Sequence, residues 1–88
     1  MKEKELERIL KALANKRRLA IISFLRKKKE ANVGDIAEVI RLSIKSTSRH
    51  LTILFGADLL DREQRNTEVF YSLTSSLPEL FLPLIKSL

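Results

Sequence analysis

One short segment holds most of the side chains that could recognise another molecule. Residues 45–50 read Lys-Ser-Thr-Ser-Arg-His, with two positive charges, three hydroxyl groups and no carboxylate. Lys and Arg donate to guanine N7 and O6, and Ser and Thr bond to bases or phosphates. The segment therefore predicts contact with the base edges and phosphates of DNA. The alternative is an ordinary exposed helix that happens to be basic.

Catalytic chemistry has few candidates in this chain. There is no cysteine, His50 is the one histidine, and there are only two glycines. The sequence offers no nucleophile beside a base, no catalytic pair of carboxylates and no glycine-rich phosphate loop. A disulfide framework and a thiolate metal site are excluded as well. We therefore expect a protein that is not an enzyme and uses no cofactor.

Two short helices are expected to position this segment. Apolar residues at helical spacing predict one helix over Val33–Ile40, and Ser43 is a suitable N-cap for a second over Ile44–Leu54. Positions 47, 51 and 54 share the inner face of the second helix. Its outward side chains are Lys45, Ser46, Ser48, Arg49 and Thr52. Two helices joined by about three residues form a helix-turn-helix, here residues 33–54.

A β-hairpin is expected directly after these helices, in the place of a wing at residues 60–73. The predicted strands are Leu60–Glu63 and Val69–Leu73, with a polar turn between them. Arg62 and Arg65 would place positive charge near the hairpin tip, where a phosphate or minor groove could be touched. Three nearby acidic residues offset them, so a purely structural hairpin is the alternative.

The helix before the helix-turn-helix has an unusual first turn. Asn15 is a suitable N-cap for Lys16–Lys28. The first turn then contains Lys16, Arg17 and Arg18, the wrong charge for the helix dipole. Either this end meets phosphates, or it is a solvated turn in which Arg18 pairs with a carboxylate. We favour the second explanation.

Helices are also expected at both ends, over residues 1–14 and 76–88. Ser75 or Ser76 would cap the last helix, Pro78 would be tolerated in its first turn, and Pro83 would kink or loosen it. Their apolar stripes exceed what one small core needs, so we expect a dimer interface. The alternative is that both helices simply pack onto their own domain. Its candidate residues are Leu6, Leu10, Leu80, Phe81, Leu84 and Leu88.

Composition agrees with this plan. The 88 residues carry 17 basic and 11 acidic side chains, a net charge of +6, which favours polyanionic partners. We expect one mainly α domain over residues 1–88 with a small β-hairpin. No apolar run approaches the roughly 20 residues that span a bilayer, and no signal peptide is recognisable. The expected location is the cytoplasm.

The motifs together resemble the ArsR-type winged helix-turn-helix repressors. Residues 13–22, LANKRRLAII, are similar to the family opening L-A-D-P-T-R-x-x-I-L, and VGDIAE at 33–38 is similar to V-G-E-L-A-E. Leu42-Ser43 with SRHLTIL at 48–54 resembles L-S-x-x-x-x-S-R-H-L-x-x-L. ADLL at 57–60 resembles the family's A-G-L-V, and VFYSL at 69–73 resembles its last wing strand. The resemblance covers about residues 10–75.

The resemblance implies a homodimer that represses transcription by occupying an operator on double-stranded DNA. The first and last helices would form the dimer, and two recognition helices would enter major grooves roughly 34 Å apart. The DNA contacts carried over by position are Lys45, Ser46, Ser48 and Arg49, with Ile44, His50 and Arg65 as further candidates. The alternative is a winged-helix module that binds a protein or RNA.

Departures from the family pattern shape further expectations. Residues 31–35, where the family has thiolate ligands, read Ala-Asn-Val-Gly-Asp, and the last helix lacks the family's Asp and His ligands. We therefore expect no metal at the usual sites. Arg41 and Asp58 stand where Gly is common, so we expect differently shaped turns. Ile44 and Lys45 replace Gln and Ser, so the operator sequence cannot be borrowed from relatives.

Overall fold

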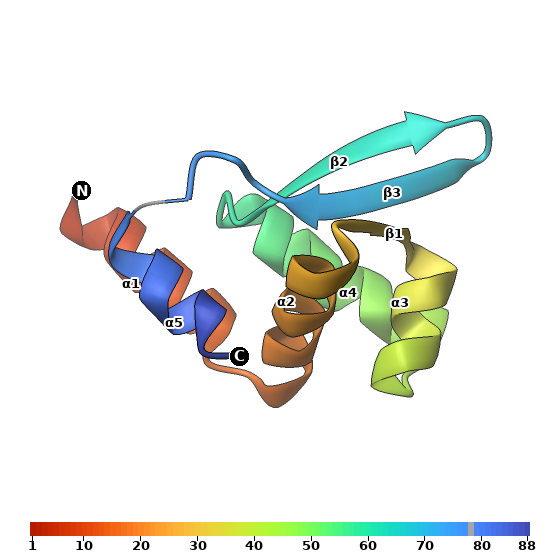
Figure 1. The fold of residues 1–88 in the computed structure, drawn as a ribbon, viewed down its shortest axis with the longest axis horizontal. Helices are drawn as coiled ribbons and strands as arrows, with labels where there is room; N and C mark the ends of the chain where they lie inside the picture. Colours follow the sequence, from red (N-terminus) through yellow and green to blue (C-terminus); the bar gives the residue numbers. More distant parts are fainter. Residues whose placement is uncertain (78) are drawn as a thin grey trace.

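Helices dominate the fold, and a small sheet lies along one side (Figure 1). The computed structural model describes residues 1–77 and 79–88. The elements are α1 (Glu3–Leu13), α2 (Lys16–Lys28), β1 (Glu30–Asn32), α3 (Val33–Ile40), α4 (Ile44–Gly56), β2 (Leu60–Arg65), β3 (Glu68–Leu73), the 3-10 turn η1 (Glu79–Phe81) and α5 (Leu82–Lys86).

The helices before the wing begin where the sequence predicts. The Asn15 side chain accepts hydrogen bonds from the N–H groups of Arg17 and Arg18, which caps α2. The Ser43 side chain accepts from the N–H of Ser46 and caps α4. The structure confirms the predicted helix-turn-helix, and α4 runs two residues further than expected, to Gly56.

The sheet contains one strand that the sequence did not predict. The strand order is β1-β3-β2 and both pairings are antiparallel, with Ala31 opposite Tyr71 and Arg65 opposite Glu68. β1 has only three residues, too few to show a period-two pattern. Both hairpin strands extend further toward the turn than predicted, so the turn contains only Asn66 and Thr67. Asn66 takes a φ of 57°, which asparagine tolerates.

The C-terminal segment corrects the prediction of one helix over 76–88. A 3-10 turn comes first, and the α-helix begins only at Leu82 and spans five residues. Pro83 has no amide hydrogen and is accommodated in the first turn, so it marks a helix start rather than an interior kink. The predicted place of Pro78 lies outside the described residues.

The core lies between α2, α3, α4 and the root of the wing, with α1 and α5 packed on it. Its fully buried large side chains are Ile21, Ile22, Leu25, Ile36, Leu51, Leu54, Leu59, Leu60 and Phe81. Phe81 therefore packs inside the single chain and leaves no surface for a second copy. This corrects its assignment to the dimer stripe.

The two turns that lack glycine keep the left-handed backbone. Arg41 has φ 55° and Asp58 has φ 60°, so the prediction of differently shaped turns is wrong. Each residue accepts a strain of roughly 1 kcal/mol that glycine would avoid. Lys29, at the end of α2, also has a positive φ, of 76°. The backbone path of the helix-turn-helix is thus set by packing and not by the turn residue.

Candidate nucleic-acid interface

The outer face of α4 is basic and polar. Lys45 and Arg49 are exposed, and Ser46 and Ser48 are half-buried beside them. Thr47, Leu51 and Leu54 face the core, as predicted. No acidic residue occurs among the thirteen residues of α4, so nothing on this helix repels a phosphate. The structure thus brings the four principal candidates for DNA contact onto one surface.

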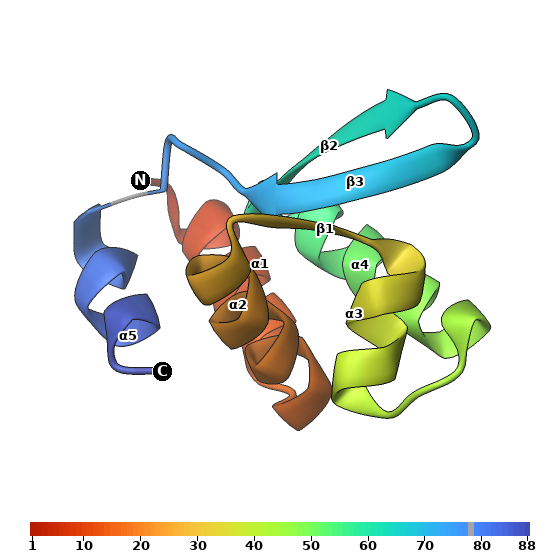
Figure 2. The same cartoon turned by 45° about the vertical axis from the view of Figure 1, so that its right-hand side comes forward.

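The hairpin extends beyond the helices on the side where α3 begins, next to β1 (Figure 2). Between its tip and α4 lies an open hollow of about 460 Å³. Ile44 and Ser48 line it from α4, Thr67 and Glu68 from the hairpin, and Asp35 from α3. Ile44 thus joins the four candidates at the N-terminal end of α4, on the side nearest the wing.

Arg17 ties the start of α2 to the turn of the helix-turn-helix. Its guanidinium donates to the carbonyl of Ile40 and, at 3.0 Å, to the carbonyl of Arg41. These carbonyls lie at the C-terminus of α3, where the helix dipole is negative and the last carbonyls lack helical partners. Arg17 therefore fixes the turn that sets the angle of α4.

Arg18 ties the same turn of α2 to α1 and α4. Its Nε donates to the Ala12 carbonyl at 2.5 Å, and its Nη2 lies 3.3 Å from the Lys11 carbonyl. Its Nη1 lies 3.2 Å from His50 Nδ1. The predicted carboxylate partner of Arg18 is therefore wrong. The first turn of α2 carries positive charge because its side chains reach the negative ends of two other helices.

His50 is half-buried and occupied by this contact. Since a guanidinium can only donate, Nδ1 must accept, and the ring is neutral with its proton on Nε2. Burial, together with the charges of Arg18 and Arg17, lowers the pKa of His50 below its usual value of 6.5. The geometry makes His50 a residue that positions α4. The functional pair Arg18–His50 was missed in the sequence, where the unfavourable charge of the α2 first turn was its signal.

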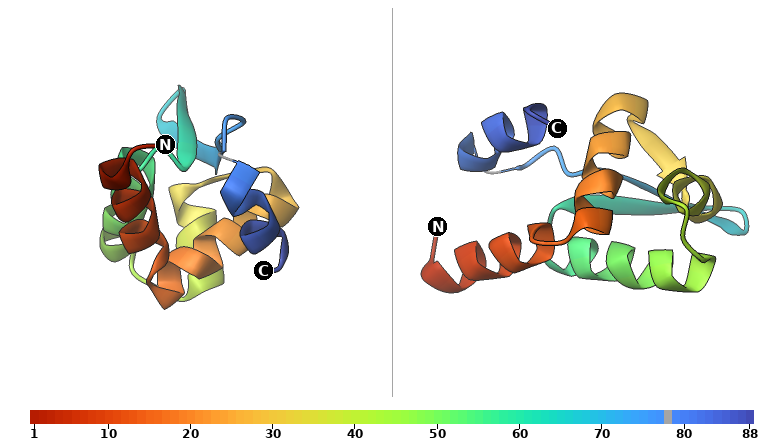
Figure 3. Two further views of the ribbon diagram at one scale, coloured as in Figure 1. Left: turned by 90° about the vertical axis from the view of Figure 1, so that its left-hand side faces the viewer. Right: turned by 90° about the horizontal axis from the view of Figure 1, so that it is seen from below.

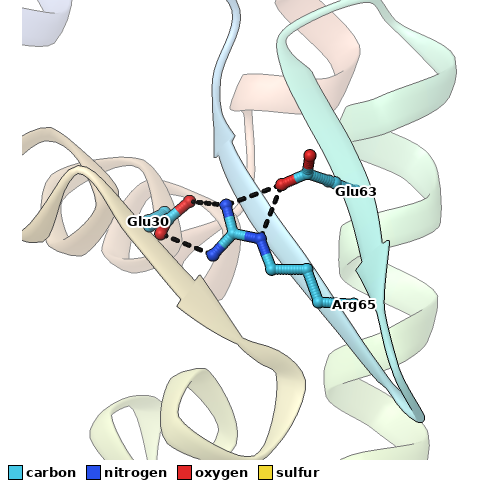
Figure 4. A network of polar contacts seen from close by, with 3 residues as sticks. All are labelled: Glu30, Glu63 and Arg65. Carbon is cyan, nitrogen blue, oxygen red and sulfur yellow. Dashed lines mark hydrogen bonds and ion pairs between the residues drawn. The ribbon is translucent and has the colours of Figure 1, made fainter.

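Arg65 lies at the end of β2, but its side chain reaches back across the sheet (Figure 4). It donates to both oxygens of Glu30 on β1 at 2.8 Å and to Glu63 at 2.6 Å. Its guanidinium also stacks on Phe70 of β3, 4.6 Å from the ring centre. These hydrogen bonds raise the pKa of Arg65 and lower the pKa of Glu30. Arg65 therefore joins three strands instead of offering free charge at the tip.

Arg62 is likewise engaged within the fold. It lies opposite Tyr71 in the middle of the hairpin, and its guanidinium stacks 4.1 Å above the ring of Phe55 on α4. This cation–π contact fastens the wing to α4. The expectation that Arg62 and Arg65 together place charge near the tip is wrong, and the structural alternative describes the hairpin better.

The remaining dimer candidates lie at the end of the molecule opposite the wing tip, where α1 and α5 both run (Figure 3). On α1, Leu10 is 48% exposed, and together with the half-buried Leu6 it lines a shallow apolar hollow. On α5, Leu84 is 58% exposed, and Leu88, just beyond the end of α5, is also exposed. The Leu80 side chain lies outside the described part. Four of the six predicted residues thus share one end of the molecule.

The residues at the family's usual metal positions do not fit a metal. Asn32 is occupied, because its side chain accepts from the N–H of Asp35 and donates to Glu68. Ala31 is buried in β1, and α5 contains no Asp or His. Within residues 1–77 and 79–88, no three His, Cys, Asp or Glu side chains gather as a metal site. No helix among the described residues is long and apolar enough to cross a membrane.

Comparisons with known proteins agree with this geometry. The family model described as "Bacterial regulatory protein, arsR family" matches residues 15–62. The transcriptional activator HlyU of Vibrio cholerae is 34% identical over 80 residues, covering 91% of this chain and 73% of the relative. The transcriptional repressor PagR of Bacillus anthracis is 31% identical over 77 residues, covering 88% and 77%.

Solved structures of relatives have the same fold. HlyU from Vibrio cholerae superimposes with a TM-score of 0.83 at 30% identity, covering 99% of this chain and 96% of that one. The winged helix-turn-helix DNA-binding domain of Mb0332 from Mycobacterium bovis, described as homodimeric, gives 0.80 at 27% identity, covering 96% and 74%. The chain therefore belongs to the ArsR family of bacterial regulatory proteins and is a winged helix-turn-helix transcriptional regulator.

Proposed function

We propose that this regulator is a homodimeric repressor that occupies a palindromic operator with α4 in the major groove. The observation that carries the proposal is the outer face of α4. It presents Lys45, Ser46, Ser48 and Arg49 without a carboxylate, and a helix of this width fits the major groove. The net charge of +6 adds sequence-independent attraction to phosphates.

Repression is the simpler of the two regulatory outcomes found among the named relatives. PagR is described as a repressor and HlyU as an activator. A protein represses by occupying a promoter and needs no additional surface for the polymerase. The proposal assigns the outer face of α4 to DNA and the α1 and α5 end to the second copy, so it requires no further surface.

The second copy is proposed to dock on the α1 and α5 end. Leu10 and Leu84 are large exposed apolar residues there, and their burial would favour association. Leu84→Glu should give a monomer by sedimentation velocity and weaken operator binding, because one half-site provides less binding free energy. Val39→Glu places the same charge on an exposed apolar site of α3 and should leave the dimer intact. A monomeric wild type would refute this part.

We further propose that the usual metal sites of the family do not regulate this protein. Residues 31–35, where the family has thiolate ligands, contain no cysteine, and Asn32 among them caps α3. Adding Zn²⁺ should leave the melting temperature unchanged in a thermal-shift assay and should leave the affinity unchanged in an operator-binding assay. A saturable effect of Zn²⁺ on both quantities would overturn the statement.

Substitution of the basic residues tests the role of α4 directly. Each good base contact contributes about 1–3 kcal/mol, so Lys45→Ala with Arg49→Ala should weaken operator binding by at least about 30-fold. The matched control is Arg26→Ala with Lys28→Ala, which removes the same charge from the exposed end of α2. The control should lower operator and random-DNA binding alike. Equal losses from both double variants would reject α4 as the reading helix.

A protein or RNA partner is the second candidate function. The observation that favours it is the wing, because the exposed guanidinium groups of Arg62 and Arg65 are already engaged by Phe55 and Glu30. A chain that selects no sequence from random duplex DNA would support this candidate over the operator.

A further inference from the structure

The first residue of α4 is an isoleucine that faces solvent. Ile44 is 61% exposed, although a β-branched apolar side chain gains free energy from burial. It has no role in the core cluster, and Ser43 provides the N-cap that this end of the helix needs. Folding therefore does not explain the residue at this position.

Its surroundings point to DNA as the occupant of this surface. Lys45 follows it directly, and Ser48 lies one turn further along and lines the same hollow. α4 itself carries Lys45 and Arg49 and no acidic residue, so the helix is complementary in charge to nucleic acid, while Asp35 and Glu68 line the far side of the hollow. In helix-turn-helix proteins the N-terminal residues of the second helix contact base edges. Ile44 is at the end of α4 where such contacts are made.

The major groove offers one strongly apolar group to such a side chain. Base edges there present hydrogen-bond donors and acceptors, and thymine adds its C5-methyl group. Isoleucine can neither donate nor accept a hydrogen bond. Its χ1 angle is restricted by β-branching, so a contact costs little side-chain entropy. A pyrimidine C5-methyl is thus the only base-edge group that Ile44 complements.

We infer that Ile44 is a specificity-determining residue that reads a pyrimidine C5-methyl, as thymine, at one position of each operator half-site. The inference rests on the proposed function, because it assumes that α4 enters the major groove. It makes thymine methyl contact a part of the operator code beside the hydrogen bonds of Lys45 and Arg49.

Replacing thymine by deoxyuridine tests the inference, because this change removes only the methyl group. In the operator selected from random DNA, each thymine is replaced in turn and affinity is measured by fluorescence anisotropy. At one position per half-site the wild type should lose about fourfold, the effect of one buried methyl. Ile44→Ala removes the contact from both half-sites of the homodimer, so it should bind the thymine operator about 15-fold more weakly than the wild type. The variant should be insensitive to deoxyuridine there. Ile44→Val should keep part of the sensitivity.

Two exposed apolar residues provide controls. Ile53→Ala changes a 46% exposed isoleucine further along α4, and Val39→Ala changes an exposed side chain on α3. Both variants should keep the full deoxyuridine effect at the Ile44 position. 5-Methylcytosine placed there should recover affinity relative to cytosine in the wild type and in both controls, but not in Ile44→Ala, which separates the methyl group from the thymine hydrogen-bond groups.

Three results would overturn the inference. Specific binding with no deoxyuridine position costing more than twofold would remove it while leaving the proposed function intact. Sensitivity that persists in Ile44→Ala, or disappears in Ile53→Ala, would assign the methyl contact to another residue. Failure to select any operator would end the proposed function and this inference together.

Discussion

Arg18 should be a major determinant of stability although it is only partly buried. Arg18→Met keeps a long apolar chain but removes the guanidinium that reaches Lys11, Ala12 and His50. The carbonyls of Lys11 and Ala12 lie in the last turn of α1 and have no helical partner. The variant would leave them and the His50 nitrogen without their donor.

The magnitude follows from the individual contacts. The Ala12 contact at 2.5 Å and the His50 contact at 3.2 Å count as charge-assisted hydrogen bonds, whereas the Lys11 contact at 3.3 Å adds little. Such bonds contribute about 1.5–3 kcal/mol each, and part exposure reduces this value. We expect Arg18→Met to lower the free energy of unfolding by about 2–4 kcal/mol, and Arg18→Lys by about half as much.

Equilibrium urea unfolding, followed by far-UV circular dichroism at one fixed protein concentration, measures this loss. Lys16→Met is the matched control, because it removes a positive charge from the same turn of α2 but from an exposed side chain. The control should be neutral or slightly stabilising, since positive charge opposes the dipole at a helix start. A change within about 0.5 kcal/mol for Arg18→Met, or equal effects of both variants, would refute the reasoning.

Three further predictions concern backbone strain, a buried hydroxyl and pH. Lys29 has φ 76°, so Lys29→Gly should stabilise the fold by about 1 kcal/mol in urea unfolding. Lys29→Ala is the control, because it removes the charge but retains the Cβ. An equal gain in Lys29→Ala would attribute the effect to charge instead of backbone strain. Thr47 Oγ1 is buried and finds no hydrogen-bond partner among the described residues, so Thr47→Val should be neutral or about 1 kcal/mol more stable, while Thr47→Ser should be less stable; a large loss in the valine variant would show that the hydroxyl is bonded. The pKa of His50 is lowered below 6.5 in the fold, so the unfolded chain binds more protons, and stability that is present above pH 6.5 is lost as pH falls through the folded pKa. His50→Asn keeps an acceptor for Arg18 without titrating, so unfolding curves between about pH 7.5 and pH 5 should show the wild type losing stability relative to the variant, and parallel pH profiles would contradict the assignment.

The sequence predicted the helices because their signals are local. Asn15 and Ser43 are capping residues at the starts of α2 and α4, and the structure confirms both caps. The inner face of α4 followed from the 3.6-residue period. The same logic failed at the C-terminus, where the apolar stripe suggested one long helix. There the backbone restriction of Pro83 decided where α5 begins.

Non-local pairing explains what the sequence could not provide. β1 is defined by its partner β3 and not by its own three residues. Glu30 and Arg65 are far apart in the chain, and only the strand order brings the carboxylate to the guanidinium. Arg41, between α3 and α4, and Asp58, between α4 and β2, adopt left-handed backbone because the packed elements on either side require it. In each case a tertiary contact outweighed the local preference.

The candidate site was partly readable for the same reason. The exposed positions of α4 followed from periodicity, so Lys45 and Arg49 were found. The sequence did not reveal that Arg17 and Arg18 hold α4 in place, because their partners are backbone carbonyls on other helices. The only sign of these contacts in the sequence was the positive charge in the first turn of α2, and that charge allowed several explanations.

Selection from random duplex DNA, followed by a salt titration of the best binder, tests the central claim most directly. We predict an enriched palindrome that is bound far more tightly than non-specific DNA. For about six phosphate contacts, the slope of log affinity against log salt should be roughly −5. Enrichment of no sequence, with only weak and salt-sensitive binding, would contradict the claim that α4 reads an operator.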